Sequence, residues 1–156
     1  MTEASAAFST RAYQQSDRDD LIAMYADFEP KRAAQGLPPT GEGKIGIWLD
    51  RILKRGQHMV VHVDGLLRGH IMLVPMDDGS LELANFLHQS VRNRGIGTAL
   101  NALALRLARD AGHSRVWLSV EPGNKAAVRS YEKVGFKKLP GSNWAPEIEM
   151  TAELLP

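Results

Sequence analysis

Apolar positions recur along this chain with two spacings, one typical of strands and one typical of helices. Short β-branched or alternating apolar runs predict strands over residues 9–13, 59–63, 66–74, 81–87, 116–120, 136–139 and 148–151. Apolar residues three and four positions apart predict helices over residues 16–28, 45–53, 96–111 and 124–134. The predicted order is therefore a strand, two helices, three strands, a helix, a strand, a helix and a final hairpin.

Turn-forming residues separate most of these elements. Asp64-Gly65 lies between two strand runs, where this dipeptide favours a two-residue hairpin. Gly112 follows the third predicted helix, at the position where a glycine commonly ends one. Residues 31–42 are rich in glycine, proline and charge, and the pattern constrains them least. No repeat or linker interrupts the order, so the sequence predicts a single domain over residues 1–156.

The composition indicates an ordered protein with balanced charge. Hydrophobic residues make up 44% and charged residues 24%, with 19 Lys and Arg against 18 Asp and Glu, which argues against disorder and against a surface that coats nucleic acid. The absence of cysteine excludes disulfides, thiolate metal sites and a cysteine nucleophile. Residues 1–9 lack the basic and apolar segments of a secretion signal. We therefore expect a cytoplasmic protein with neither a membrane nor a nucleic acid as partner.

The strongest chemical signal is a basic, glycine-containing turn at residues 91–98, between a predicted strand and a predicted helix. Gly95 and Gly97 allow the backbone to approach a bulky anion and to direct N–H groups toward it. The first turn of the helix adds unpaired donors and a partial positive charge, and Arg92 and Arg94 add charge beside it. The pattern favours a bound phosphate, and an ordinary strand-to-helix turn with solvated arginines is the alternative.

Two common phosphate-binding motifs do not fit this turn. The dinucleotide fingerprint requires a third glycine, and Leu100 occupies that position. A P-loop requires Gly-Lys-Ser/Thr, which does not follow the turn. The sequence therefore indicates another ligand that contains phosphate.

Residues 87–97, Leu-His-Gln-Ser-Val-Arg-Asn-Arg-Gly-Ile-Gly, resemble the acyl-CoA pyrophosphate loop of the GCN5-related N-acetyltransferases, the GNAT family. The pattern of that loop is Gln/Arg-x-x-Gly-x-Gly/Ala, and Arg92, Gly95 and Gly97 fill its fixed positions. The family's second signature is similar to a later set of residues, the strand 116–120 followed by Asn124, Ala127, Tyr131, Gly135 and Phe136. Two signatures in the right order are stronger evidence than either alone, and the close match covers roughly residues 81–139.

The resemblance implies a fold and an acyl donor. The implied fold is α+β (α/β), a GNAT-like mixed and mostly antiparallel sheet of six or seven strands with helices on both faces, splayed at its central strands 81–87 and 115–120. The implied acyl donor is acetyl-CoA, without a metal, and its pantetheine arm pairs with backbone of the strand before the turn. The implied donor-binding residues are Phe86, Leu87, His88, Arg92, Asn93, Arg94, Gly95, Ile96, Gly97, Thr98, Asn124, Ala127 and Tyr131.

The implied activity is transfer of an acetyl group from acetyl-CoA to a primary amine by direct attack. Making a lysine-like amine neutral at pH 7 costs about 4.6 kcal/mol, so a base is expected. Glu82 is the candidate base, which requires burial and a raised pKa, whereas water or a solvent-facing strand glutamate is the alternative. Tyr131 matches the family's general acid for the leaving thiolate, and a packing residue on a helix face is the alternative. An N–H near Leu87 is the expected oxyanion donor, and His88 fits either a catalytic or a hydrogen-bonded strand-end residue.

The sequence does not specify the acceptor amine. In the family, the acceptor site is shaped by segments that correspond to residues 28–48 and 140–146. Candidate contributors in or beside them are the acidic Glu29, Glu42 and Asp50 and the apolar Trp48 and Trp144. Small amines, amino acids, aminoglycosides and peptide N-termini all remain open, and a homodimer is expected because relatives are often dimers.

Two functions of other classes fit parts of the sequence. A non-catalytic acyl-CoA-binding sensor would use the turn and Asn124 without turnover, and Tyr131 argues against it. A nucleotide or nucleic-acid binder would use the arginines of the turn and the basic cluster Arg51, Lys54 and Arg55. The net charge of only +1, with aromatic residues not interleaved among these bases, argues against that binder.

Overall fold

The computed structural model describes residues 8–29, 38–39, 41–141 and 147–154. The chain divides into two compact units. The first unit runs to Ile71 and also includes residues 86–96, and the second includes residues 72–85 and the chain from Gly97 onward. Two strands, β3 (Leu66–Pro75) and β4 (Leu81–Leu87), contribute residues to both units.

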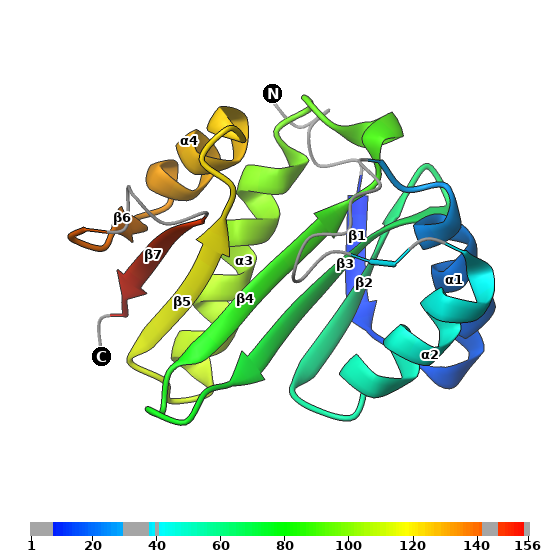
Figure 1. The fold of residues 1–156 in the computed structure, drawn as a ribbon, viewed down its shortest axis with the longest axis horizontal. Helices are drawn as coiled ribbons and strands as arrows, with labels where there is room; N and C mark the ends of the chain where they lie inside the picture. The colour runs from blue at the N-terminus through cyan, green and yellow to red at the C-terminus, as the bar shows by residue number, and fades with distance from the viewer. Residues whose placement is uncertain (1–7, 30–37, 40, 142–146, 155–156) are drawn as a thin grey trace. The chain divides into compact units, whose positions relative to one another are not determined.

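The first unit begins with β1 (Phe8–Ala12), a short 3₁₀ turn η2 (Gln15–Asp17), α1 (Arg18–Ala26), α2 (Glu42–Ile52) and β2 (Gln57–Val63) (Figure 1). A second 3₁₀ turn, η3 (Gln89–Val91), follows the end of β4. Strands β1 and β2 pair antiparallel, from Phe8 with Val63 to Ala12 with Met59. The predicted two-residue hairpin is confirmed, because Asp64 and Gly65 both have positive φ, 53° and 81°.

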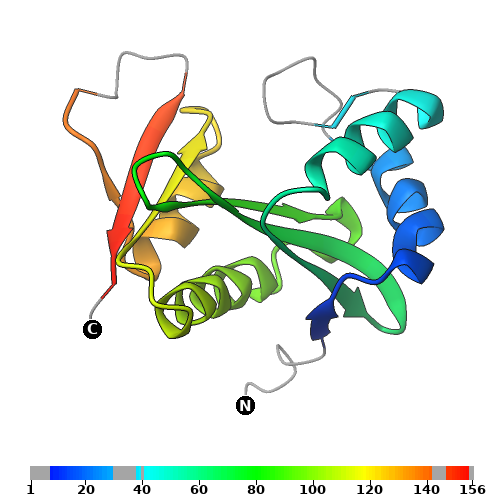
Figure 2. The ribbon, with the colours of Figure 1, turned by 90° about the horizontal axis from the view of Figure 1, so that it is seen from below.

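The second unit contains α3 (Ile96–Asp110) from Gly97, β5 (Arg115–Val120), α4 (Lys125–Lys133), β6 (Lys137–Lys138) and β7 (Ile148–Glu153). Strand β7 pairs antiparallel with both β5 and β6, and Figures 1 and 2 show β5 and β7 side by side. Strands β4 and β5 pair parallel at only two positions, Leu81 with Val116 and Glu82 with Trp117. The predicted splay of the central strands therefore begins directly after Glu82.

The strand order in the sheet is β1-β2-β3-β4-β5-β7-β6, which confirms the predicted mixed, mostly antiparallel α+β fold. Some predicted boundaries were wrong. The strand predicted over residues 136–139 is limited to Lys137–Lys138, because the Phe136 N–H donates to the Tyr131 carbonyl and closes the end of α4. The third helix ends as predicted, with Gly112 at a φ of 92° and the His113 N–H donating to the Ala108 carbonyl.

Aromatic rings fill the core of the first unit. Tyr25 is 1% exposed, and its ring centroid lies 5.0 Å from that of Trp48 and 5.6 Å from that of Phe86. On the outside of the two helices, the Arg18 guanidinium donates two hydrogen bonds to the Asp50 carboxylate, at 2.9 and 2.8 Å. Helices α1 and α2 are therefore joined by an apolar contact on one side and a bidentate ion pair on the other.

One side of α3 is buried in the second unit. Leu100, Ala104 and Ala108 are fully buried, whereas Ala111, the last residue of the predicted helix 96–111, is exposed beyond the end of the helix. The buried side also includes a polar residue, Asn101. In β5 the predicted alternation is confirmed, with Val116, Leu118 and Val120 buried on one side.

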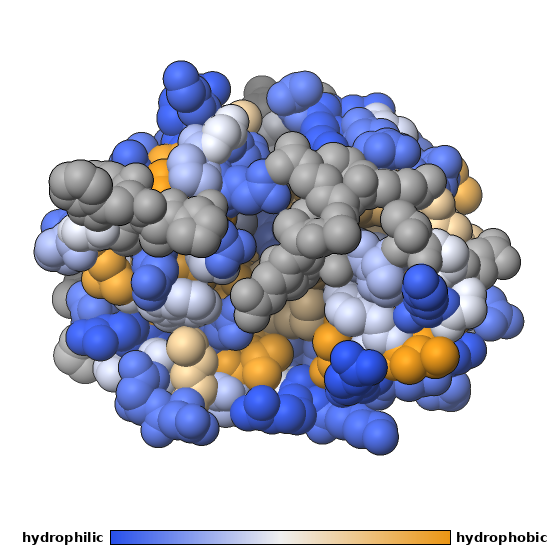
Figure 3. Space-filling model, viewed as in Figure 1, coloured by the Kyte–Doolittle hydropathy of each residue, from blue (hydrophilic) through white to orange (hydrophobic). Residues whose placement is uncertain are grey.

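Large exposed apolar side chains are few among the described residues. Ile47 and Leu66 are the two that are mainly exposed. On the face drawn in Figure 3, hydrophobic residues appear as small, separate groups within a mostly hydrophilic surface. In the described part of the chain, no helix has the length and apolar character needed to span a bilayer.

A chain of buried polar groups crosses the core of the first unit. The Tyr25 hydroxyl lies 2.6 Å from His70 Nδ1, His70 Nε2 lies 2.9 Å from His58 Nδ1, and His58 Nε2 lies 2.7 Å from the Arg55 carbonyl oxygen. Because the last acceptor is a carbonyl, His58 must donate from Nε2, and each earlier group then donates to the next. The whole chain is therefore satisfied with both histidines neutral.

This arrangement predicts that the protein loses stability in mild acid. Burial, and secondarily the neighbouring His58, lowers the pKa of His70 to about 3, and burial also lowers the pKa of His58. An unfolded histidine takes up a proton near pH 6.5, so the unfolded chain binds more protons than the folded chain below that pH. We expect the free energy of unfolding to fall as the pH is lowered from about 6.5 toward 4, by up to about 1.4 kcal/mol per pH unit for each histidine.

Urea unfolding of the wild type and of His70→Gln between pH 7.5 and 4.5 tests this expectation. The variant should be less stable at pH 7.5, by on the order of 1–3 kcal/mol, and should show a flatter dependence on pH. His113→Gln, outside the polar chain, should keep the wild-type slope. Equal slopes for the wild type and His70→Gln would show that His70 is not responsible.

Candidate active site

The sequence-predicted site residues divide between the two units. Those in the first unit are Phe86, Leu87, His88, Arg92, Asn93, Arg94, Gly95 and Ile96. Those in the second unit are Glu82, Gly97, Thr98, Asn124, Ala127 and Tyr131.

The turn between η3 and α3 has the backbone form that an anion-binding turn requires. Asn93 and Gly95 adopt positive φ, 64° and 80°, and nothing lies within 4 Å of where a Cβ on Gly95 would be. Among the described residues, the N–H groups of Arg94 and Gly95 donate to no protein acceptor. The turn therefore presents exposed donors next to open space at the start of α3.

The Arg92 side chain holds this turn to the end of α1. Its Nε donates to the Leu87 carbonyl at 2.8 Å and its Nη2 donates to the Glu29 carbonyl at 2.5 Å. The guanidinium also lies over the Phe28 ring, 5.1 Å from the centroid. The positive charge of Arg92 therefore lies beside the turn. Because two of its N–H groups already bind protein carbonyls, the predicted contact of Arg92 with phosphate would use the remaining N–H groups.

Two neighbouring side chains strengthen this attachment. Gln89 donates to the Asp27 carbonyl at 2.6 Å and accepts from the Glu29 N–H at 2.9 Å. The buried His88 imidazole lies 2.9 Å from an Asp27 carboxylate oxygen through Nε2, and its Nδ1 accepts from the Ser90 N–H at 3.1 Å. The imidazole of His88 is thus a bonded strand-end residue, one of its two predicted roles.

Backbone directions at the end of β4 determine which amides remain available. The His88 N–H donates to the Arg68 carbonyl of β3 at 2.8 Å. Successive N–H groups of a strand point to opposite sides, so the Leu87 N–H points away from β3. The predicted pairing with pantetheine would therefore use the Leu87 N–H and leave the His88 N–H within the sheet.

Arg94 remains at the surface of the turn. Its Nη1 lies 3.7 Å from the Asp64 carboxylate, and both side chains are about half exposed or more. Such an exposed ion pair contributes little to stability and is easily exchanged for another anion.

In the second unit, the start of α4 carries two of the predicted residues. The Asn124 side-chain oxygen accepts from the Ala127 N–H at 3.2 Å and caps the helix. The cap uses the oxygen, so the Nδ2 donors of this exposed side chain remain for a ligand.

Tyr131 lies on α4 with its ring 5.6 Å from the Phe136 ring. Burial raises the pKa of Tyr131 to about 12, so the phenol keeps its proton throughout the neutral range. Within the described residues its hydroxyl makes no hydrogen bond. The side chain thus combines packing with a free proton donor.

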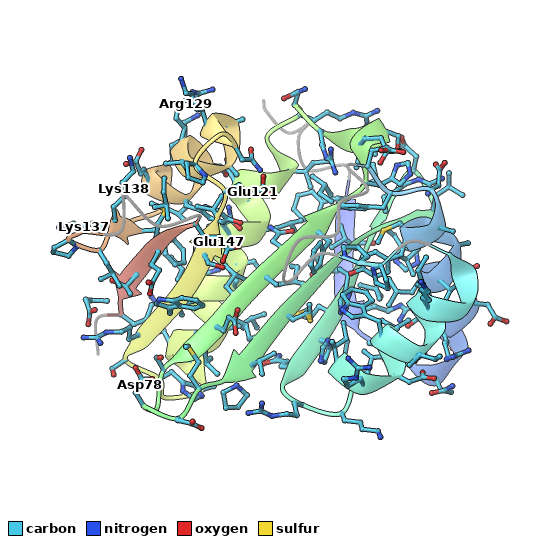
Figure 4. All side chains as sticks on the ribbon, in the orientation of Figure 1. Asp78, Glu121, Arg129, Lys137, Lys138 and Glu147 are labelled. Carbon is cyan, nitrogen blue, oxygen red and sulfur yellow. The ribbon has the colours of Figure 1, made fainter. Side chains whose placement is uncertain are left out.

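Glu82 is half-buried on β4, beside Trp117 of β5. Burial raises the pKa of Glu82, and the negative charge of Glu147 raises it further. Glu147, labelled in Figure 4, directly precedes β7, in which Glu149 accepts a hydrogen bond of 2.9 Å from the Trp117 indole. The raised pKa that a base at Glu82 requires is therefore present.

The candidate acceptor residues are only partly described. Asp50 is paired with Arg18, which lowers the pKa of Asp50, and Trp48 packs in the aromatic core of the first unit. Glu29 lies three residues after α1, and its carbonyl accepts the hydrogen bond from Arg92. The Glu42 side chain and the segment 142–146, with Trp144, lie outside the described residues. Among the residues that are described, no group of three His, Asp or Glu side chains is arranged to hold a metal.

Sequence reasoning missed a hydrogen-bonded network that joins three elements of the second unit. Asn85 of β4 donates to Asn101 of α3 at 2.9 Å, and Asn101 donates to Ser130 of α4 at 3.2 Å. Asn101 gave a usable signal, since a polar residue among buried positions of an amphipathic helix requires a partner.

The comparisons with known proteins agree with this fold. The model of the acetyltransferase (GNAT) family matches residues 18–136. An uncharacterized N-acetyltransferase of Mycobacterium bovis is 40% identical over 134 residues, which cover 78% of this chain and 84% of that protein. The mycothiol acetyltransferase of Mycolicibacterium vanbaalenii is 32% identical over 104 residues, 62% of this chain but only 31% of that protein.

Solved structures with the same fold include two acetyltransferases. The ribosomal-protein-alanine N-acetyltransferase of Brucella melitensis has a TM-score of 0.75 at 22% identity, over 94% of this chain and 99% of that one. The acetyltransferase yncA of Salmonella typhimurium, solved with its cofactor acetyl-CoA, has a TM-score of 0.72 at 17% identity, over 96% of this chain and 95% of that one. The predicted family and the predicted class, an acyltransferase, are confirmed, and the chain belongs to the acetyltransferase (GNAT) family.

Proposed function

We propose that this protein transfers the acetyl group of acetyl-CoA to a primary amine, as one domain formed by residues 1–156. The observation that carries this proposal is the turn before α3, where the free N–H groups of Arg94 and Gly95 lie next to open space. The family match over residues 18–136 runs through both units, which supports a single functional domain.

The donor would bind by its diphosphate at this turn. The amides of the turn, the N-terminus of α3 and the cation of Arg94 all favour an anion, and an anion that faces a helix N-terminus at an exposed site gains about 0.3–1 kcal/mol. The free Leu87 N–H would pair with the pantetheine arm or stabilise the oxyanion of the thioester. The Asn124 Nδ2 group would bond the arm farther along, with Ala127 beside it.

The proposed reaction uses Glu82 as base and Tyr131 as acid. Glu82, directly or through one water, accepts a proton from the ammonium group, and the neutral amine nitrogen attacks the thioester carbonyl carbon. A C–N bond forms, the C–S bond breaks, Tyr131 donates its proton to the thiolate that leaves, and the second proton that the nitrogen loses is released to solvent. The products are the N-acetylated amine and coenzyme A, and Tyr131 regains a proton from Glu82 through solvent.

The acceptor class proposed here is a small-molecule or peptide amine. Proteins of the same fold include a spermidine N-acetyltransferase of Vibrio cholerae and the ribosomal-protein-alanine enzyme described above. A screen of diamines, amino sugars, amino acids and peptide N-termini, with products identified by mass, tests the proposal through the gain of one acetyl group. Tight binding of acetyl-CoA without turnover on any amine would instead indicate a sensor. Cytoplasmic location and a homodimer are further expectations.

Tyr131→Phe tests the acid. Removing the phenol proton should lower kcat on the order of 100-fold while the Kd for acetyl-CoA stays within a few-fold of the wild type, because the ring still packs on Phe136. Steady-state kinetics and isothermal titration measure the two quantities. An unchanged kcat would remove Tyr131 from this role.

Gly97→Glu tests the diphosphate site. Gly97 is the second residue of α3, so a carboxylate there should repel the diphosphate and weaken acetyl-CoA binding at least tenfold. Gly43→Glu is the matched control, because Gly43 is the second residue of α2 and has open space around it. Equal acetyl-CoA affinities for the two variants, measured by titration without an amine, would contradict the placement.

Glu82→Gln tests the base through the pH profile. Because the pKa of Glu82 is raised, this carboxylate takes up a proton at a higher pH than an ordinary glutamate when the solution is acidified. We expect the acidic limb of kcat/KM in the wild type to lie clearly above pH 4.3, the ordinary value for glutamate. The variant should lose this limb together with most of its activity, whereas a limb that persists would assign it to another group.

A further inference from the structure

A network of four polar side chains links the elements of the second unit that carry the proposed acid and base. The Asn85 amide donates to Asn101 Oδ1 at 2.9 Å, and Asn101 Nδ2 donates to Ser130 Oγ at 3.2 Å. Ser130 Oγ lies 2.8 Å from Thr98 Oγ1 in the first turn of α3. The network therefore runs from β4 through α3 to α4.

The central amide, Asn101, accepts from Asn85 and donates to Ser130, while the buried Asn85 Oδ1 has no hydrogen-bond partner among the described residues. Asn101 is 3% exposed, so water cannot easily replace a lost bond. Because Asn101 Oδ1 accepts from the Asn85 amide nitrogen, its Nδ2 faces Ser130, and turning the amide over would set two donating nitrogens against each other. Ser130 therefore accepts from Asn101, and one further hydroxyl bond joins it to Thr98.

Two members of the network lie on elements that carry a residue of the proposed reaction. Ser130 directly precedes Tyr131 on α4, and Asn85 lies on the same strand as Glu82. Thr98 belongs to the helix turn that starts at the proposed diphosphate site. In a helix, a shift or rotation of one residue also moves its neighbour in the chain. A displacement of about 1 Å of a reacting group can lower the reaction rate about 100-fold.

We infer that Ser130 and Asn101 are positioning residues that hold α4 against α3, so that the Tyr131 hydroxyl is set for proton transfer. This inference rests on the proposed function, in which Tyr131 is the acid. Neither residue touches the reacting atoms. Their effect on turnover is exerted through Tyr131, and their effect on acetyl-CoA binding is small.

The first test compares Ser130→Ala with Ser130→Thr. The alanine variant should lower kcat at least tenfold with the KM for acetyl-CoA changed less than threefold, and threonine, which keeps the hydroxyl, should restore most of the loss. Glu132→Ala is the matched control, because Glu132 flanks Tyr131 on the other side, is exposed and lies outside the network. Equal kcat values for Ser130→Ala and Glu132→Ala would overturn the inference.

The second test is a double-mutant cycle with Tyr131→Phe. If Ser130 acts through the phenol hydroxyl, Ser130→Ala should lower kcat much less in the Tyr131→Phe background than in the wild type. Equal losses in both backgrounds would show that Ser130 acts only through general stability, and this overturns the inference. An unchanged kcat in Tyr131→Phe alone would instead overturn the proposed acid, so the two failures are distinguishable.

Asn101→Leu covers the case in which a serine variant folds poorly. Leucine keeps the branching and the number of side-chain heavy atoms of Asn101 but removes both of its hydrogen bonds, and thermal melting reports whether the fold is retained. A folded Asn101→Leu protein with reduced kcat and nearly unchanged acetyl-CoA affinity supports the inference. A folded protein with wild-type kcat contradicts it.

Discussion

The function proposed for this protein depends on one backbone constraint, that the turn before α3 keeps its N–H groups unpaired. Asn93 and Gly95 must adopt left-handed φ values for these donors to point outward, and an asparagine and a glycine are the residues that accept such values at least cost. The N–H groups of Arg94 and Gly95 are satisfied only by water or an anion, so they add no hydrogen bond that holds the tip of the turn in place.

The surrounding first unit supplies that support. Arg92 and Gln89 bond main-chain groups of Asp27 and Glu29 at the end of α1, and His88 bonds the Asp27 side chain. These contacts act on the base of the turn and leave its tip free. The guanidinium of Arg92 also keeps a positive charge next to the turn, half-buried, where its field is screened less than at the surface. One side chain thus serves both structure and electrostatics.

In the second unit, the proposed reaction requires one group that keeps its proton and another that accepts one. Burial raises the pKa of both Tyr131 and Glu82, so the phenol remains an acid and the carboxylate becomes a stronger base than an exposed glutamate. The hydrogen bonds of Asn101 to Asn85 and Ser130 orient β4, α3 and α4 more specifically than apolar packing alone would.

The sequence by itself determined the features that are local in the chain. The Asp64-Gly65 hairpin, the end of α3 at Gly112 and the glycine turn with its following helix depend on residues a few positions apart, and their backbone preferences can be read in order. The same holds for Asn124 as a cap, which bonds a residue three positions later.

Only the tertiary structure decided which distant side chains meet. Arg92 bonds Glu29, Tyr25 bonds His70, Arg18 bonds Asp50 and Asn101 bonds Ser130, and no periodic pattern in the sequence pairs these residues. Their meeting depends on how strands and helices pack, since a hydrogen bond tolerates only a few tenths of an ångström in distance. The raised pKa of Glu82 is a second example. The hypothesis that Glu82 is a base requires it, but it arises from burial and from the charge of Glu147, which only the packing of the chain brings about.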